Sequence, residues 1–534
     1  MAGGVSVLTR FFADADVATQ RQEPHFLAID RLADQLDQRA KGYFELRSPT
    51  PIALDELLAS RSSALPLLRS GEALVLWMAA PGNQKGLVFA IAADGRSAWA
   101  PMSLTGKETA DRVAQLRRQI DPCTFARDNP RCYDEPLRFD RRASWELHRS
   151  LLGDPRIAAI VRAKSVDTLL IVPSDSLVSL PPALLIEEEP GDNGDDAPDA
   201  WRNSRWLIRS KALAVLPSVS SLRVLRTPGD TNPPNASAAP ATPTGPATTA
   251  TPAASPTART GTSGTGGTGG TGGTGGTGGG SGDRLYMFAD PKFASADRSA
   301  KPCSPLRRSA SESVPMPASN AQSRRTALAS LKPLPCTAEE GRILREQLGG
   351  KLYTALDARE SRLRQPADRD LLAKAEVVAF ATHGLLSGDL GLDEPGLALA
   401  APQTGDANDD GILTASEVML MKLRANIVLL SACNTADPGG RGARGISGLA
   451  RAFFQAGARS LVASHWRVDD VASARLITDL MRRVPSAGGK AKAMQQASLA
   501  ILDSDDDKDI GRDLGPNAAH PVYWAPFTVI GEPR

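Results

Sequence analysis

The chain has 534 residues, which exceeds the size of one ordinary hydrophobic core and predicts more than one structural unit. Its 62 Lys and Arg residues are almost balanced by 60 Asp and Glu residues, and this near-neutral charge argues against a dedicated surface for nucleic acid. No run approaches the roughly 18 apolar residues of a membrane span, and the amino terminus lacks the apolar segment of a signal peptide, so we expect a cytoplasmic protein without a membrane partner.

A segment rich in Thr, Pro, Ala, Ser and Gly occupies residues 227–283 and holds a large share of the 47 glycines of the chain. Such a segment cannot bury enough apolar surface to offset the entropy that is lost on ordering. It therefore predicts a flexible linker at 227–283, which divides the chain into a part before it and a part after it.

The part before the linker begins with helix-like sequence and continues with strand-like sequence. Amphipathic helices are expected at 25–48 and 52–69, and they define an amino-terminal helical segment, 1–70. Three apolar runs joined by turns then follow, at 71–80, 86–95 and 96–102. With Asp94-Gly95 as a turn, these runs predict an antiparallel meander.

Helices and a buried strand complete this part of the chain. Apolar periodicity predicts helices at 107–120 and 142–164. The run at 169–173 is short and wholly apolar, as expected for a parallel strand that is covered on both faces. Residues 71–226 are therefore predicted to form an α/β subdomain.

Strands and helices alternate regularly after the linker. Short apolar strands are predicted at 284–289, 377–381, 427–430, 460–463 and 527–530. Helices are predicted at 337–349, 414–423, 446–456 and 471–483. Because this alternation is typical of βαβ units, the sequence predicts an α/β fold built on a parallel sheet.

Reactive side chains follow two of these strands. His383 and Gly384 come after the strand at 377–381, and Cys433 comes after the strand at 427–430. Because ligands bind outside the carboxyl ends of parallel strands, these residues are expected together at one edge of the sheet. A cysteine near an imidazole and backbone donors is the arrangement of a thiol nucleophile. The alternative is that Cys433 is a small core residue and His383 a hydrogen-bonded structural one.

Longer strings around these residues carry a family resemblance. They occur in the order VAFATHG, GILTASEV, NIVLLSACNTA, GISGLARAFFQAGARSLVASHWRVDD and HPVYWAPFTVIG. Together and in this order, the strings resemble the CHAT family of caspase-like cysteine peptidases of clan CD, which are related to caspases and separase. The resemblance runs from about Gly71 to the end of the chain and is interrupted by the linker.

This resemblance implies a fold and a chemistry. The implied fold is a caspase–hemoglobinase-like parallel-sheet sandwich, with a pseudo-caspase half at 71–226 and a catalytic half at 284–534. His383 is then the general acid and base, and Cys433 is the nucleophile that forms a thioester acyl-enzyme. The backbone N–H groups of Gly384 and Cys433 line the oxyanion hole. This chemistry acts on a protein substrate and requires no cofactor.

The loop after the strand at 460–463 carries two carboxylates. The resemblance to separase-like peptidases makes Asp470, with Asp469 and Trp466 beside it, the acidic wall of a pocket for a basic substrate side chain. Because both acids precede a predicted helix, the alternative is that they cap its amino terminus.

A second acidic pattern matches the loop of an EF-hand. The spacing D-x-[DN]-x-[DN]-G-x5-E is met by five ligand positions, Asp406, Asn408, Asp410, Ile412 and Glu417. The segment before this loop does not look helical, and GILTASEV belongs to the family resemblance without calcium. Calcium binding and an acidic surface turn are therefore both open for this loop.

The sequence predicts a cytoplasmic cysteine endopeptidase that is regulated by an activating partner protein or by Ca²⁺, with no direct nucleic-acid partner. The competing class is a non-catalytic scaffold or adaptor that keeps the caspase-like fold and uses its loops for binding, with calcium as a ligand. Intact His383 and Cys433 favour the enzyme, because a scaffold does not need this pair.

Overall fold

A computed structural model describes most of the chain between Leu67 and Arg534. The described residues are 57–58, 67–122, 137–191, 197–226, 284–293, 321–401, 409–432, 435–436, 447–504, 514 and 516–534. Several predicted features lie outside them, namely the helix at 25–48, nearly all of the helix at 52–69, the linker at 227–283 and Cys433.

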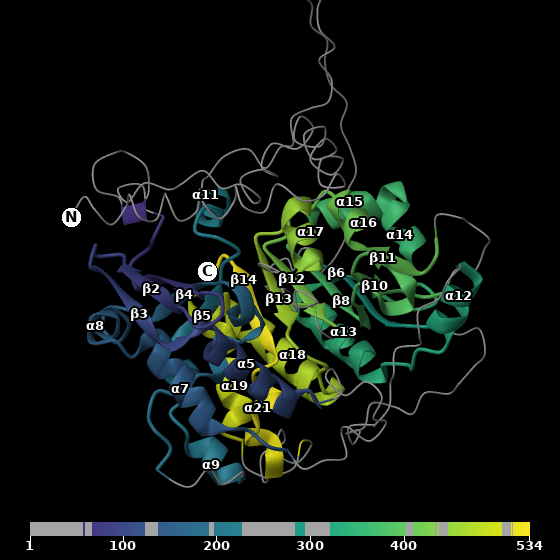
Figure 1. Cartoon of the computed structure of the whole chain (residues 1–534). Helices are drawn as coiled ribbons and strands as arrows, with labels where there is room; N and C mark the ends of the chain where they lie inside the picture. Colours follow the sequence, from purple (N-terminus) through teal and green to yellow (C-terminus); the bar gives the residue numbers. More distant parts are fainter. Residues whose placement is uncertain are drawn as a thin grey trace, which may run out of the picture.

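One large sheet organises the described residues. It contains eleven of their strands, in the order β3-β2-β1-β4-β5-β14-β13-β12-β8-β6-β7 (Figure 1). These strands are β1 (Glu72–Met78), β2 (Lys85–Ala92), β3 (Ser97–Thr105), β4 (Thr168–Pro173), β5 (Ala212–Val215), β6 (Leu285–Pro291), β7 (Gly350–Ala355), β8 (Val377–Ala381), β12 (Ile427–Ser431), β13 (Ser460–Ser464) and β14 (Phe527–Gly531). The predicted α/β fold is confirmed.

Most neighbouring strands in this sheet run parallel, as the alternation of strands and helices predicts. The meander β1-β2-β3 is antiparallel, and the hydrogen bond from Gly95 N to Ala92 O (3.0 Å) closes its predicted turn. One strand of this sheet departs from the parallel arrangement after residue 283, because β14 runs antiparallel to β13 and parallel to β5. Through β14, strands that precede the linker and strands that follow it form one continuous sheet.

Helices cover both faces of this sheet (Figure 1). One face packs on α5 (Gly106–Ile120), α7 (Arg141–Leu152), α13 (Pro335–Leu348), α18 (Asp470–Ala487) and α19 (Lys490–Leu502). The other face packs on α14 (Glu360–Arg364), α15 (Pro366–Lys374), α16 (Ala415–Met419) and α17 (Gly448–Ala456). The remaining α-helices are short segments, α8 (Pro155–Val161), α9 (Pro198–Asn203), α10 (Leu207–Ser210), α11 (Ser221–Arg226), α12 (Ala321–Ala329) and α21 (Pro521–Trp524).

The burial of β12 shows why its sequence is apolar without interruption. Ile427 and Leu429 belong to the core cluster under α13 and α18, whereas Val428 and Leu430 belong to the cluster under α17. A strand with helices on both faces has no solvent side, so apolar residues occupy successive positions.

Two predicted helices differ from the observed ones. The helix predicted at 142–164 is divided into α7 and α8, because α7 ends at Gly153 and Asp154 caps a new helix that begins at Pro155. The helix predicted at 414–423 is the shorter α16, which begins after its N-cap Thr414, a residue that pairs in a small sheet, and ends at Met419. This small sheet has the order β11-β10-β9, with β9 (Gly384–Leu385), β10 (Gly396–Ala398) and β11 (Ile412–Thr414).

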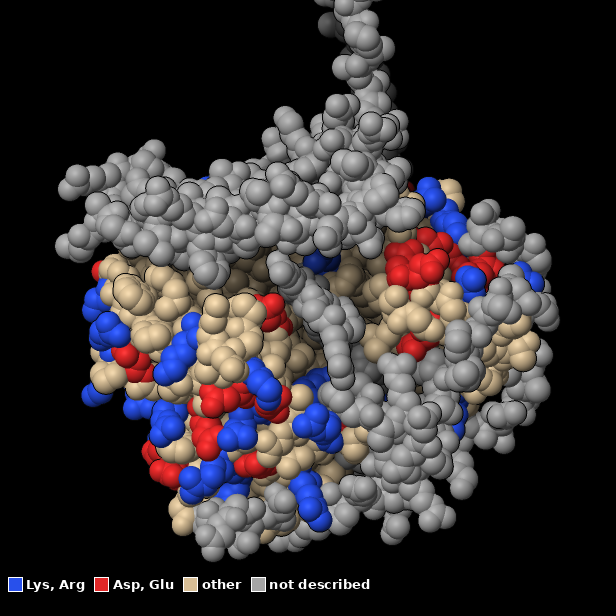
Figure 2. Space-filling view, viewed as in Figure 1, with Lys and Arg blue, Asp and Glu red and all other residues tan. Residues whose placement is uncertain are grey.

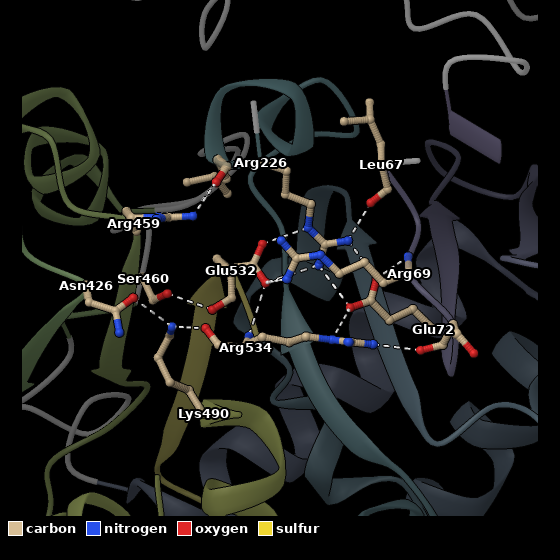
Figure 3. Close-up of polar contacts among 12 residues, drawn as sticks. Leu67, Arg69, Glu72, Arg226, Asn426, Arg459, Ser460, Lys490, Glu532 and Arg534 are labelled. Carbon is tan, nitrogen blue, oxygen red and sulfur yellow. Dashed lines mark hydrogen bonds and ion pairs between the residues drawn. The ribbon is translucent and has the colours of Figure 1, made fainter. Parts of the chain in front are cut away.

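A buried cluster of ion pairs joins segments from both ends of the chain (Figure 3). Arg226 at the end of α11 contacts Glu72 (2.6 Å) and Glu532 (2.7 Å), and all three side chains are at most 3% exposed. Arg534 adds a contact to Glu72 (3.2 Å), and Arg69 adds one to Glu532 (3.2 Å). This Arg226 cluster ties the start of β1 and α11 to the end of β14.

Charged side chains are mixed over much of the surface, as the near-neutral composition predicts. In Figure 2, basic and acidic groups alternate over the part of the molecule that contains α5, α7 and α9, and acidic groups gather in the region of α14 and α16. Among the described helices, none combines the length and the apolar character needed to span a membrane.

Candidate active site

The predicted dyad follows two strands that lie side by side in the sheet. β8 and β12 pair in parallel register, with Ala381 opposite Ser431. The backbone N–H of Thr382 extends this contact by donating to the carbonyl of Ser431 (3.2 Å). His383 comes two residues after Ala381 in sequence, and Cys433 comes two residues after Ser431. The two strand ends that carry the dyad are therefore neighbours, although Cys433 itself is not among the described residues.

The imidazole of His383 is held on one side by a backbone carbonyl. Its Nε2 lies 2.9 Å from the carbonyl oxygen of Lys332, and its ring packs against the ring of Phe293 at a centroid distance of 5.3 Å. Because a carbonyl oxygen only accepts hydrogen bonds, this contact places the proton on Nε2 and leaves Nδ1 as the basic nitrogen of the neutral ring. Lys332 is 51 positions away in sequence, and no sequence pattern identified it.

Gly384 begins the small sheet next to His383. It pairs with Leu397 of β10, and the carbonyl of His383 accepts a hydrogen bond from the backbone N–H of Ala398 (3.0 Å). These contacts hold the main chain after the histidine, and the contact of Thr382 with Ser431 holds it before. Gly384 therefore lies at the same strand end as His383, and its part in an oxyanion hole stays a prediction.

The residues that flank positions 433 and 434 are fastened to the end of β13. The hydroxyl of Ser464 donates to the carbonyl of Ala432, and its backbone N–H donates to the hydroxyl of Thr435 (3.0 Å). The carbonyl of Ser464 accepts from the backbone N–H of Ala436 (2.7 Å). Ser447, the N-cap of α17, donates to the carbonyl of Thr435. The short segment that contains Cys433 is thus anchored before and after the cysteine.

A buried acid lies against the same strand end. Glu340 on α13 is 1% exposed, and its Oε2 accepts a hydrogen bond from the hydroxyl of Ser431 (3.0 Å). The pKa of Glu340 is raised to about 8, chiefly by burial; the Ser431 hydrogen bond opposes this rise, and the negative charge of Asp470 adds to it. No motif in the sequence assigned this residue to the site.

The two carboxylates expected to line a substrate pocket lie at the start of α18. Asp469 is the N-cap of this helix and accepts a hydrogen bond from the backbone N–H of Ala472 (2.9 Å), so the capping alternative is confirmed for Asp469. Asp470 is the first residue of the helix and is partly exposed. Its role in a pocket stays a prediction.

Trp466 and His465 are buried beneath the same loop. The indole of Trp466 is 0% exposed, and its Nε1 donates to the carbonyl of Val522 (3.3 Å), so this side chain packs in the core and presents no surface in the structure. His465 Nε2 contacts the hydroxyl of Thr528 (3.0 Å). Burial, together with the charge of Arg117, lowers the pKa of His465 to about 3, which keeps this ring neutral and structural.

The predicted calcium loop is only partly described, since Asp406 and Asn408 lie outside the described residues. Oδ1 of Asp410 accepts from the backbone N–H of Ile412 (3.0 Å). Glu417 closes a capping box with Thr414, because its Oε2 accepts from the backbone N–H of that residue (3.0 Å). In the described part of the chain, no three His, Cys, Asp or Glu side chains gather in a way that could hold a metal ion. Calcium binding stays a prediction.

The chain matches one family model and is similar to two solved structures. The CHAT domain family model matches residues 141–532. Two crystal structures of the separase–securin complex of Saccharomyces cerevisiae are similar to the chain, with TM-scores of 0.42 and 0.40 and sequence identities of 10% and 9%. They cover 90% and 88% of this chain, and the chain covers 30% of the matched chain in each complex. No curated protein matches the sequence.

Proposed function

Because the chain belongs to the CHAT domain family, whose model covers residues 141–532, we propose that it is a cysteine endopeptidase that acts through Cys433 and His383. One observation carries the proposal: β8 and β12 are parallel neighbours in register, and each is followed by one member of the pair. Parallel neighbours bring their carboxyl ends to one edge of the sheet, where α/β proteins build their sites.

The proposed reaction is acyl transfer through a thioester. The sulfur of Cys433 attacks the peptide carbonyl, and the developing oxyanion accepts hydrogen bonds from the backbone N–H groups of Gly384 and Cys433. His383 accepts the thiol proton of Cys433 and delivers it to the departing amine. It then takes a proton from the water that hydrolyses the thioester and returns a proton to the thiolate that is released. The contact of Nε2 with the Lys332 carbonyl supports this role, because it fixes the orientation of the ring and makes Nδ1 the basic nitrogen.

We assign the acidic wall of the substrate pocket to Asp470 rather than to Asp469. The carboxylate of Asp469 is engaged in capping α18, and Trp466 is buried below it. Asp470 is partly exposed at the amino end of the same helix and follows β13, the strand next to β12. A carboxylate at this place favours a substrate with Lys or Arg on the acyl side of the scissile bond.

We further propose that the enzyme consists of a pseudo-caspase-like half, 71–226, and a catalytic half, 284–534, joined by the linker. Five strands of the sheet come from the first half and six from the second, and all candidate catalytic residues belong to the second. The contact of β14 with β5 joins the halves into one sheet. An activating protein partner or Ca²⁺ acting on this unit is part of the proposal.

A peptidyl acyloxymethyl ketone with Arg or Lys at P1 tests the function directly, since an activated thiol displaces its carboxylate and is alkylated as a stable thioether. We expect the probe to label Cys433, to lose most of its labelling in His383→Ala and to keep it in Cys123→Ala. Labelling is read residue by residue by mass spectrometry, with and without Ca²⁺. A chain that never reacts at Cys433, or that reacts equally in His383→Ala, would contradict the endopeptidase and favour a non-catalytic scaffold.

A further inference from the structure

Glu340 lies where the helix layer meets the end of β12. It sits in the middle of α13, is 1% exposed and contacts the strand through the hydroxyl of Ser431 at 3.0 Å. Its second oxygen, Oε1, has no hydrogen-bond partner within the described part of the structure. A buried carboxyl group held by a single contact is costly, because its lost hydration is only partly replaced.

Ser431 is the residue at which both strand ends meet. Its hydroxyl contacts Glu340, its carbonyl accepts from the backbone N–H of Thr382 (3.2 Å), and its backbone lies opposite Ala381. Thr382 precedes His383 directly, and Ser431 precedes Cys433 by two residues. Any shift of Ser431 therefore moves the histidine strand end and the cysteine strand end relative to each other.

We propose that Glu340 is a positioning residue for the dyad: its carboxyl group fixes Ser431 and so sets the place of Cys433 relative to His383. The inference rests on the proposed peptidase function and adds a third residue to it. Glu340 acts through Ser431 and does not touch the substrate.

The charge state of Glu340 makes the reactivity of Cys433 depend on pH if Glu340 has this role. Burial raises the pKa of Glu340 to about 8, so the group is mostly a neutral acid at pH 7 and becomes an anion above pH 8. Asp470 is the charged group of α18 that acts on it, and it also disfavours the anion. Arg475 of α18 acts instead on Glu339, and Asp290 of β6 accepts from the backbone N–H of Leu334 (3.1 Å).

The Glu340 anion that forms at alkaline pH disfavours a negative charge on Cys433, which follows the strand end that Glu340 contacts. Because a thiolate is the nucleophile, ionised Glu340 slows the reaction of Cys433 in a way that a neutral side chain cannot. Glu340→Gln keeps an acceptor for Ser431 and removes the ionisation. Glu340→Ala and Ser431→Ala both remove the contact.

The test measures alkylation of Cys433 by iodoacetamide and inactivation by the peptidyl probe between pH 6.5 and 9. We expect the ratio of alkylation rates, Glu340→Gln over wild type, to rise several-fold from pH 6.5 to pH 9. Glu339 lies on the same helix and is ion-paired with Arg342, so Glu339→Gln serves as the matched control. We expect its ratio of alkylation rates to wild type to stay constant with pH. A constant ratio for Glu340→Gln would overturn the proposal.

The contact with Ser431 is tested by the maximal rate of inactivation by the probe. We expect Glu340→Ala and Ser431→Ala each to lower it roughly 10- to 100-fold with little change in probe affinity, and the double variant to lose no more than either single one. Additive losses, or full activity in Ser431→Ala, would overturn the proposal even if Glu340→Ala fails to fold. If Cys433 is not labelled in wild type, the peptidase and this inference are refuted together. If labelling depends on His383 but the kinetics of Ser431→Ala are unchanged, the inference alone is refuted.

Discussion

Removing the positive charge of Arg226 is expected to destabilise the whole sheet. In Arg226→Met, the side chains of Glu72 and Glu532 stay 1% and 3% exposed and lose their main partner. Breaking a buried ion pair by removing one member costs about 3–5 kcal/mol, because the remaining charge is buried without compensation. Arg534 and Arg69 still contact the two carboxylates at 3.2 Å, so we expect the free energy of unfolding to fall by about 3 kcal/mol, the lower end of this range.

Urea unfolding followed by tryptophan fluorescence measures this loss, because Trp77, Trp201, Trp206, Trp466 and Trp524 are all buried in the core. The matched control is Asp111→Asn, which breaks the exposed pair with Lys107 on α5 and is expected to cost less than about 0.5 kcal/mol. A loss below about 1 kcal/mol for Arg226→Met would refute the reasoning. A double variant Arg226→Met with Glu72→Met should lose less than the sum of its single variants, since no unpaired charge is left at Glu72.

Three further predictions concern the linker, pH and calcium. Limited proteolysis within 227–283 should give two fragments that still elute together in gel filtration, because β5, β14 and the Arg226 cluster join the parts that flank this segment; separate elution would contradict the continuous sheet. The folded state keeps the proton of Glu340 that the unfolded chain releases above its ordinary pKa of 4.5, so the free energy of unfolding should fall as pH rises from about 5 to 8. Glu340→Gln should flatten this decline in urea titrations, and parallel pH profiles would speak against a buried neutral acid. If the EF-hand-like spacing is a calcium site, isothermal calorimetry should show Ca²⁺ binding that is lost in Asp406→Ala. If wild type gives no heat of binding, the segment is an acidic surface turn.

The local parts of the fold could be predicted from the sequence. The apolar runs at 377–381 and 427–430 are the strands β8 and β12, and the helix expected at 337–349 is α13 within two residues. Asp469 caps α18, which was one of the two alternatives for it. Such features depend on neighbours within a few positions of the chain, so periodicity and capping residues reveal them.

The strands that sequence reasoning missed are short or atypical. β5 has only four residues and β7 is mostly half-buried, so neither produces the long apolar run by which a buried strand is recognised. The direction of β14 also could not be read from its residues, because an apolar strand has the same pattern in either orientation.

The candidate site was predicted by residue type and completed by contacts across the fold. His383 and Cys433 were identified because each follows an apolar strand and matches a family string. The Lys332 carbonyl behind His383 and the carboxyl of Glu340 behind Ser431 come from segments 51 and 91 positions away. The indole of Trp466, expected at a pocket, is instead buried against Val522.

The sequence by itself determined the class of fold, the strands that reactive side chains follow and the types of the candidate catalytic residues. Each of these depends only on residues that are close together in the sequence. Only the tertiary structure decided that β14 joins the two parts of the sheet, that Glu72 and Glu532 share Arg226, and that Glu340 lies under Ser431. These depend on which strands become neighbours, and that choice is made by the packing of the entire sheet rather than by any single segment.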